Sequence, residues 1–162
     1  MLPLRVINIY PETIVDGEGL RYSIYFSGCA HCCKGCQNPE TWEYNQGSIL
    51  DESLETRIFS EINANPLLSG VTLSGGDPMY NPEGLLDFLK KLKKNTKANV
   101  WCYTGFVFER LQKDAIRSKC LKYIDVLVDG PFVERKRNVN LAFRGSSNQR
   151  IIKVKTAEIL QY

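Results

Sequence analysis

Short apolar segments alternate with amphipathic helical segments along this chain, and this alternation constrains the fold more than any other feature. Such a β-α order with short connections is typical of a mainly parallel sheet with right-handed crossovers. A complete eightfold barrel needs about 250 residues, whereas the chain has 162. We therefore expect an α/β fold, a truncated and open (β/α) barrel with a mainly parallel sheet. Strands are predicted over residues 4–9, 21–27, 71–73, 99–103, 123–128 and 150–154, and helices after Asp51, after Asn81 and over 106–116.

Composition and charge exclude several classes of protein. Twenty-one Lys and Arg against 18 Asp and Glu give a formal charge of +3, which is not the charge pattern of a nucleic-acid-binding protein. No apolar stretch approaches the about 20 residues of a membrane-spanning helix, and the first ten residues lack the apolar run of a secretion signal. No repeat or linker marks a second domain. We expect one cytoplasmic domain over residues 1–162 that binds neither nucleic acid nor membrane.

Four of the six cysteines stand within eight residues, at positions 29, 32, 33 and 36. A cluster this dense indicates a metal or redox site in a reducing compartment rather than a disulfide framework. One interpretation uses all four thiolates for a tetrahedral zinc ion, although zinc sites usually separate their cysteine pairs by a dozen or more residues. The other uses Cys29, Cys33 and Cys36 as a CxxxCxxC loop. Because ordinary iron–sulfur clusters take four thiolates, such a loop leaves one iron open to a substrate.

A second motif, Ser74-Gly75-Gly76-Asp77-Pro78, follows the predicted strand at 71–73. The carboxyl ends of parallel strands meet at one edge of a sheet, so this turn and the cysteine loop are expected on the same edge. Glycines let backbone approach a ligand closely, and a carboxylate accepts hydrogen bonds from a cation. The alternative interpretation is a strand-to-helix turn in which Asp77 caps the helix.

Together the CxxxCxxC loop and the Gly-Gly-Asp turn resemble the corresponding motifs of the radical S-adenosylmethionine superfamily. Residues 16–21 (DGEGLR) are similar to the entry of glycyl-radical activating enzymes. Residues 28–42, 129–132 and 143–150 (FRGSSNQR) resemble one subgroup, the activating proteins of anaerobic ribonucleoside-triphosphate reductase. The resemblance covers about residues 15–152, with Asp77 in the place of the usual Glu.

This resemblance implies a mechanism and a set of site residues. A reduced 4Fe-4S cluster would cleave S-adenosyl-L-methionine, and the 5′-deoxyadenosyl radical would take hydrogen from a glycine of the reductase. The residues implied are Cys29, Cys33 and Cys36 as cluster ligands, Gly35, Cys36 and Gln37 beside the adenine, and Ser74, Gly75, Gly76 and Asp77 at the methionine end, with no catalytic residue beyond the cluster ligands.

The implied partners are the large subunit of the reductase and a low-potential electron donor. Two alternatives stay open: another glycyl-radical enzyme as the target, such as pyruvate formate-lyase, and a non-catalytic zinc module. We expect His31, the only histidine, to order the loop, and Cys32 to be a spectator. The segment 143–150 either covers the ligand or meets the partner.

Overall fold

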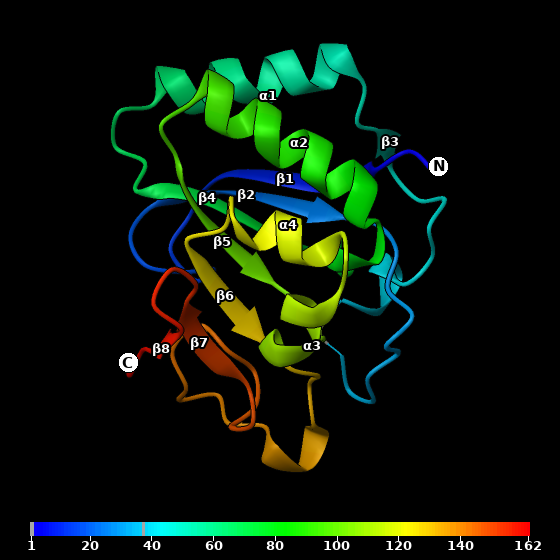
Figure 1. Ribbon diagram of the computed structural model, residues 1–162, viewed down its shortest axis with the longest axis vertical. Helices are drawn as coiled ribbons and strands as arrows, with labels where there is room; N and C mark the ends of the chain where they lie inside the picture. The colour runs from blue at the N-terminus through cyan, green and yellow to red at the C-terminus, as the bar shows by residue number, and fades with distance from the viewer. Residues whose placement is uncertain (1, 37) are drawn as a thin grey trace.

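A computed structural model describes residues 2–36 and 38–162 and has an α/β fold built on one mixed sheet (Figure 1). In these residues, eight strands follow the order β3-β1-β2-β4-β5-β6-β7-β8, and the sheet does not close. The strands are β1 Arg5–Thr13, β2 Arg21–Phe26, β3 Ser48–Ile49, β4 Gly70–Gly75, β5 Asn99–Tyr103, β6 Val126–Asp129, β7 Arg150–Lys153 and β8 Glu158–Ile159. The α-helices are α1 Glu52–Ala64, α2 Pro82–Asn95, α3 Phe108–Lys113 and α4 Arg117–Leu121, and 3₁₀ turns cover Pro39–Thr41, Pro78–Tyr80 and Glu134–Lys136.

The helices predicted after Asp51 and after Asn81 are confirmed, and these two residues cap them. An Asp51 Oδ1 oxygen accepts a hydrogen bond from the backbone N–H of Leu54 at 2.9 Å, at the start of α1. Asn81 Oδ1 accepts from Gly84 N at 3.1 Å, at the start of α2, where Pro82 needs no partner for its nitrogen. Among the described residues, no helix combines the length and the apolar character needed to cross a membrane.

The prediction of a mainly parallel sheet is correct only for its centre. Strands β2, β4, β5 and β6 are parallel, and the helices α1 to α4 provide the crossovers between them. The outer pairs β1–β2, β1–β3, β6–β7 and β7–β8 are antiparallel. The connection at residues 130–149 has no α-helix to return the chain to the other edge of the sheet. Strand β7 therefore starts beside the end of β6 and pairs with it in the antiparallel direction.

The helix predicted over 106–116 is wrong in extent, because α3 ends at Lys113 and a second short helix, α4, begins at Arg117. Asp114 separates them, and its Oδ1 accepts hydrogen bonds from the N–H groups of Ile116 at 3.0 Å and Arg117 at 2.8 Å. A side chain that caps a new helix in this way competes with continuation of the first. The two-residue strands β3 and β8 were not predicted, since a pair of residues carries no periodic signal.

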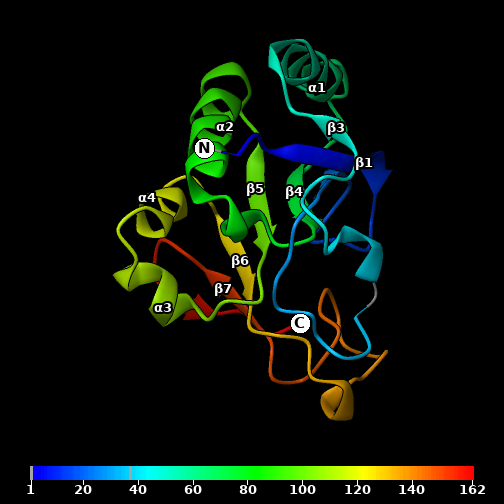
Figure 2. The ribbon, with the colours of Figure 1, turned by 90° about the vertical axis from the view of Figure 1, so that its right-hand side faces the viewer.

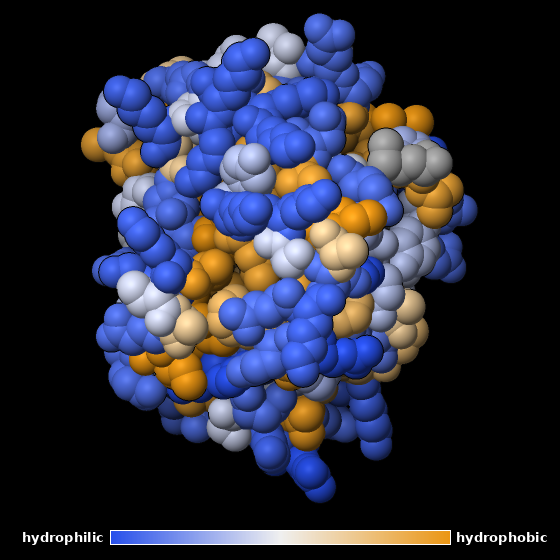
Figure 3. Space-filling view, in the orientation of Figure 1, coloured by the Kyte–Doolittle hydropathy of each residue, from blue (hydrophilic) through white to orange (hydrophobic). Residues whose placement is uncertain are grey.

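The sheet buries apolar side chains on both faces. Helices α1, α2 and α4 lie over one face, as Figures 1 and 2 show. Val100 and Cys102 of β5 pack under these helices, whereas Trp101 packs on the opposite face with Val126 and Ile151. This is the period-two alternation of a strand. In the view of Figure 1, hydrophilic side chains cover α1 and α2, and apolar side chains gather in a hollow below them (Figure 3).

Arg21 joins three parallel strands at their amino ends, and its side chain is almost fully buried. Its Nε donates to Thr72 Oγ1 at 2.8 Å, and its Nη2 donates to Val71 O at 3.0 Å and to Asn99 Oδ1 at 2.9 Å. Burial lowers the pKa of the guanidinium to about 10. The acceptors of these hydrogen bonds are neutral oxygen atoms of Thr72, Val71 and Asn99, so Arg21 is held here without a carboxylate partner.

Replacement of Arg21 by Met is expected to lower the free energy of unfolding by about 2–4 kcal/mol, because several buried acceptors lose their donor. Arg57→Met is the matched control, since Arg57 is exposed and forms an ion pair with Glu61 on the same helix. The control is expected to change stability by less than about 0.5 kcal/mol. Urea unfolding of the reduced, metal-free proteins measures both, and equal effects would contradict the role of Arg21.

Candidate cluster and cofactor site

The cysteine loop and the Gly-Gly turn lie side by side at the carboxyl edge of the sheet, as predicted. Phe26 is paired with Gly75 in the parallel register of β2 and β4. Beyond the strands, Gly76 N donates to Phe26 O at 2.7 Å, and Asp77 N donates to Gly28 O at 2.9 Å. A Cβ on Gly76 would lie 2.6 Å from Gly28 O, so the absent side chain lets the two loops meet.

Three of the four clustered cysteines are alike in burial, and the fourth differs. Cys29, Cys33 and Cys36 are half-buried, Cys32 is exposed, and all are free thiols. Burial raises the pKa of Cys29 to about 11 and also raises that of Cys33. Cys32 has a φ of +47°. Cys32 thus differs from the other three cysteines in exposure and in backbone conformation, which agrees with the CxxxCxxC interpretation.

The donor set, three half-buried thiols on one short loop, fits an iron–sulfur cluster, whose ligands are thiolates. In the part of the chain that the structure describes, no three His, Cys, Asp or Glu side chains converge as the ligands of a single metal ion do. The thiolates of a cluster bind different irons and do not need to converge in this way. The loop is also fixed internally, because Cys36 N donates to Cys33 O at 3.1 Å and Asn38 N lies 3.4 Å from Cys36 Sγ.

Asp77 is a buried carboxylate whose two oxygens accept hydrogen bonds from the protein. Its Oδ1 accepts from Met79 N at 2.9 Å, which caps the 3₁₀ turn. Its Oδ2 accepts from Thr104 Oγ1 at 3.0 Å and Gly105 N at 2.8 Å, just beyond β5. With 3% of its surface exposed, the carboxylate joins the ends of β4 and β5 in this structure.

His31 ties the cysteine loop to the same carboxylate. Its Nε2 lies 2.7 Å from Asp77 Oδ2. The ring packs edge-on between Tyr80 and Phe106, with centroid distances of 4.9 and 4.8 Å. A Cβ on Gly105 would lie 2.5 Å from the imidazole. This enclosed contact agrees with the expectation that His31 orders the loop.

A cavity of about 300 Å³ lies between the two motifs, and both contribute to its lining. Cys36 lines it from the cysteine loop and Ser74 from the Gly-Gly turn. The predicted residues Gly35, Gly75, Gly76 and Asp77 are not part of this lining. Gly35 lies against Glu134 of the β6–β7 connection, and Gln37 is outside the described residues. The remaining lining was not predicted residue by residue and consists of Val15, Asp16, Tyr103, Phe132, Leu141, Phe143, Arg144, Gly145 and Gln149. Of these, Asp16, Phe132 and the residues of 143–149 carried a sequence signal, because they fall in the runs 16–21, 129–132 and 143–150 that resemble the activating enzymes.

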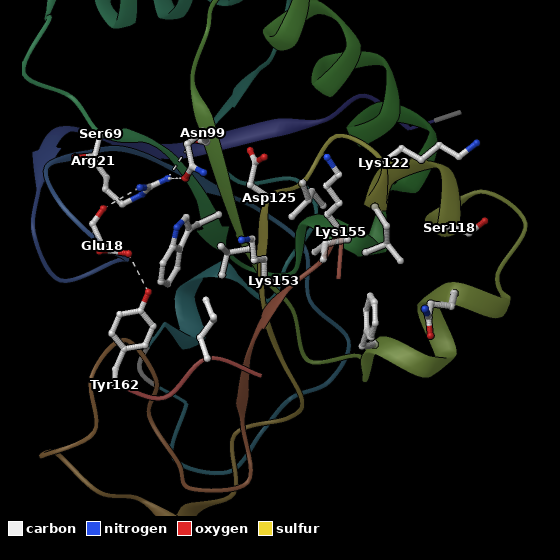
Figure 4. A pocket seen from close by; sticks show the side chains of 18 residues that line it. Glu18, Arg21, Ser69, Asn99, Ser118, Lys122, Asp125, Lys153, Lys155 and Tyr162 are labelled. Atoms are coloured by element: carbon white, nitrogen blue, oxygen red, sulfur yellow. Dashed lines mark hydrogen bonds between the residues drawn. The ribbon is translucent and has the colours of Figure 1, made fainter. Parts of the chain in front are cut away.

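A larger cavity, of about 1210 Å³, lies at the opposite edge of the sheet (Figure 4). Arg21, Asn99 and Val126 line it, and each is the first residue of its strand. Figure 4 shows Tyr162 directed at Glu18, with which it forms a hydrogen bond of 2.9 Å. None of the described cysteines lines this cavity, so it is separate from the cysteine site.

Comparison with known proteins identifies close similarities over nearly the whole chain. Residues 15–152 match the family model of the 4Fe-4S single cluster domain. The anaerobic ribonucleoside-triphosphate reductase-activating protein of Haemophilus influenzae is 36% identical over 156 residues, which are 94% of this chain and 99% of that protein. The protein of the same name from Escherichia coli is 37% identical over 145 residues, covering 86% and 92%. That of Enterobacteria phage T4 is 34% identical over 147 residues, covering 89% and 90%.

Asp77→Asn is expected to speed alkylation of Cys29 by iodoacetamide in the metal-free protein. An amide replaces one acceptor oxygen by an NH₂ group, so the contacts to His31 and Gly105 weaken and the loop gains water. The raised pKa of Cys29 then falls, and each unit of decrease gives about tenfold more reactive thiolate at pH 8. Peptide mass spectrometry measures the rate, with the exposed Cys32 as internal reference.

Asp51→Asn is the matched control, because Asn caps α1 as well as Asp does and the site lies elsewhere. An unchanged Cys29 rate in Asp77→Asn would show that the carboxylate does not hold the loop.

Proposed function

Since the chain belongs to the family of anaerobic ribonucleoside-triphosphate reductase-activating proteins, we propose that it uses a 4Fe-4S cluster and S-adenosylmethionine to generate a glycyl radical on such a reductase. One observation carries the proposal: a loop with three half-buried thiols is joined by backbone hydrogen bonds to a Gly-Gly turn. A cluster ligated by the loop and a cofactor bound along the turn would be neighbours.

Cys29, Cys33 and Cys36 hold the cluster in this proposal, and Cys32 stays outside it. Three ligands would leave one iron open to the methionine moiety of the cofactor. When bound, the reduced cluster supplies the electron that splits S-adenosylmethionine into methionine and a 5′-deoxyadenosyl radical, which takes hydrogen from a glycine of the partner. The protein contributes ligation, orientation and exclusion of water.

The cofactor occupies the cavity between the two motifs. Gly35 and Cys36 pass the adenine, with Gln37 assigned there by sequence alone, and Ser74, Gly75 and Gly76 hold the methionine end. Asp77 acts on that end through the turn that it fixes, because both of its oxygens are used within the protein.

Three aromatic residues form part of the wall of this cavity. Tyr103, Phe132 and Phe143 are part of its lining. The Tyr103 hydroxyl donates to Phe143 O at 2.6 Å, and burial raises its pKa. The Tyr103 phenol therefore stays protonated. It forms part of the cavity wall and does not act as an acid or a base.

The metal content of cysteine variants tests the cluster. Anaerobic reconstitution with iron and sulfide is expected to give about four irons per chain, and Cys29→Ala, Cys33→Ala and Cys36→Ala are each expected to lose most of it. Cys32→Ala is the matched control and retains the iron. One stoichiometric zinc that disappears in Cys32→Ala would instead support the zinc module, because a tetrathiolate site needs all four ligands.

The reaction itself is tested with the partner. The reduced holoprotein is expected to convert S-adenosylmethionine into 5′-deoxyadenosine, and a mixture with anaerobic ribonucleoside-triphosphate reductase is expected to show a glycyl radical by electron paramagnetic resonance. The same mixture with pyruvate formate-lyase is the control for the target and stays silent. Intact cofactor after reduction would refute the activity, and a radical on the lyase alone would reassign the partner.

A further inference from the structure

Arg144 is a cation of the cavity lining that forms no ion pair with an acidic side chain of the described residues. Its side chain lines the cavity together with Cys36 and Ser74. Among the residues described, no carboxylate lies within 4.0 Å of its guanidinium. The nearby Arg150, in contrast, contacts Asp129 at 2.6 Å and Glu109 at 2.8 Å. The charge of Arg144 is therefore available to a ligand of the cavity.

The hydrogen bonds of Arg144 leave one edge of the guanidinium free. Nη1 donates to Gln149 O at 2.7 Å. Nε is buried and has no acceptor among the described residues, and no acceptor there contacts Nη2. Nε and Nη2 form the side of the guanidinium that binds a carboxylate through two parallel hydrogen bonds. A buried donor without a partner is uncommon, which points to an acceptor supplied from outside the chain.

The backbone around Arg144 is held in place before any ligand binds. Phe143 has a left-handed φ of +62°, a conformation that non-glycine residues adopt rarely and often at functional sites. Gln149 Oε1 accepts from Gly145 N at 2.9 Å, and Gln149 Nε2 donates to Gly130 O at 3.1 Å. These bonds fasten the segment to the end of β6, so the free edge of Arg144 is preorganised.

We propose that Arg144 binds the carboxylate of the methionine moiety of S-adenosylmethionine and so selects the intact cofactor over analogues without that group. The inference rests on the proposed function. The carboxylate is the one anionic group of this cofactor, and the adenine and ribose offer only neutral acceptors. Asp16 is the acidic side chain of the cavity lining, and its carboxylate is already hydrogen-bonded to the Tyr25 hydroxyl at 2.8 Å. The segment 143–149 thus serves the ligand rather than the partner.

The test compares two ligands on two proteins. Equilibrium dialysis of the reconstituted, unreduced holoprotein gives Kd for S-adenosylmethionine and for decarboxylated S-adenosylmethionine. In the wild type, the ratio of the two Kd values reports every contact of the carboxylate, including any contact with iron, so the effect of Arg144 is read from the change in this ratio. Arg144→Met is expected to shrink that ratio by about ten- to a hundredfold, the effect of a buried charge-assisted pair. Arg135→Met, in the exposed turn outside the cavity, keeps the wild-type ratio.

Each outcome separates a different failure. A wild type that holds iron but binds no S-adenosylmethionine would refute the proposed function. Binding with the same ratio in wild type and Arg144→Met would refute only the role of Arg144, and unchanged binding with weakened capture of the reductase would assign the segment to the partner. Equal loss of both ligands would show a structural role. If circular dichroism shows that Arg144→Met does not fold, Arg144→Lys is the deciding variant. Lysine keeps the positive charge but lacks the two-nitrogen side of the guanidinium, so an intermediate ratio is expected.

Discussion

The site depends on direct backbone contact between two loops at the carboxyl edge of the sheet. The register of β2 and β4 sets Phe26 beside Gly75, and the next two N–H groups of the turn donate to Phe26 O at the end of β2 and to Gly28 O just before the first cysteine. Any side chain on Gly76 would collide with Gly28 O. A glycine is therefore needed at position 76 for the contact between the two loops, and this contact in turn leaves space for a ligand.

Asp77 extends this contact to a third strand. One carboxylate accepts from His31, Met79, Thr104 and Gly105, which belong to the cysteine loop, the turn and the end of β5. A buried carboxylate is costly unless it is fully hydrogen-bonded, and here each oxygen has partners. A fully satisfied polar group specifies one arrangement of its neighbours. The thiols of the loop thereby gain a fixed position relative to the sheet.

The sequence allowed prediction of the features that are local. Asp51 and Asn81 cap helices because a capping side chain acts within three residues, and the cysteine spacing separates Cys32 from its neighbours. The direction of β7 was wrong, because it depends on how residues 130–149 travel in space. The inward orientation of Asp77 was likewise beyond the sequence, since Thr104 and Gly105 lie 27 and 28 residues away.

The β6–β7 connection contains no α-helix that could pack it onto the sheet. Side chains in it and next to it supply hydrogen bonds instead. Asn148 donates to Pro131 O at 2.7 Å, and Arg150, at the start of β7, pairs with the buried Asp129, which also accepts from Phe108 N at 2.8 Å. The same connection contributes Phe132 and Arg144 to the cavity. Because one segment both completes the sheet and lines the site, a change that loosens its attachment to β6 must also alter the cavity.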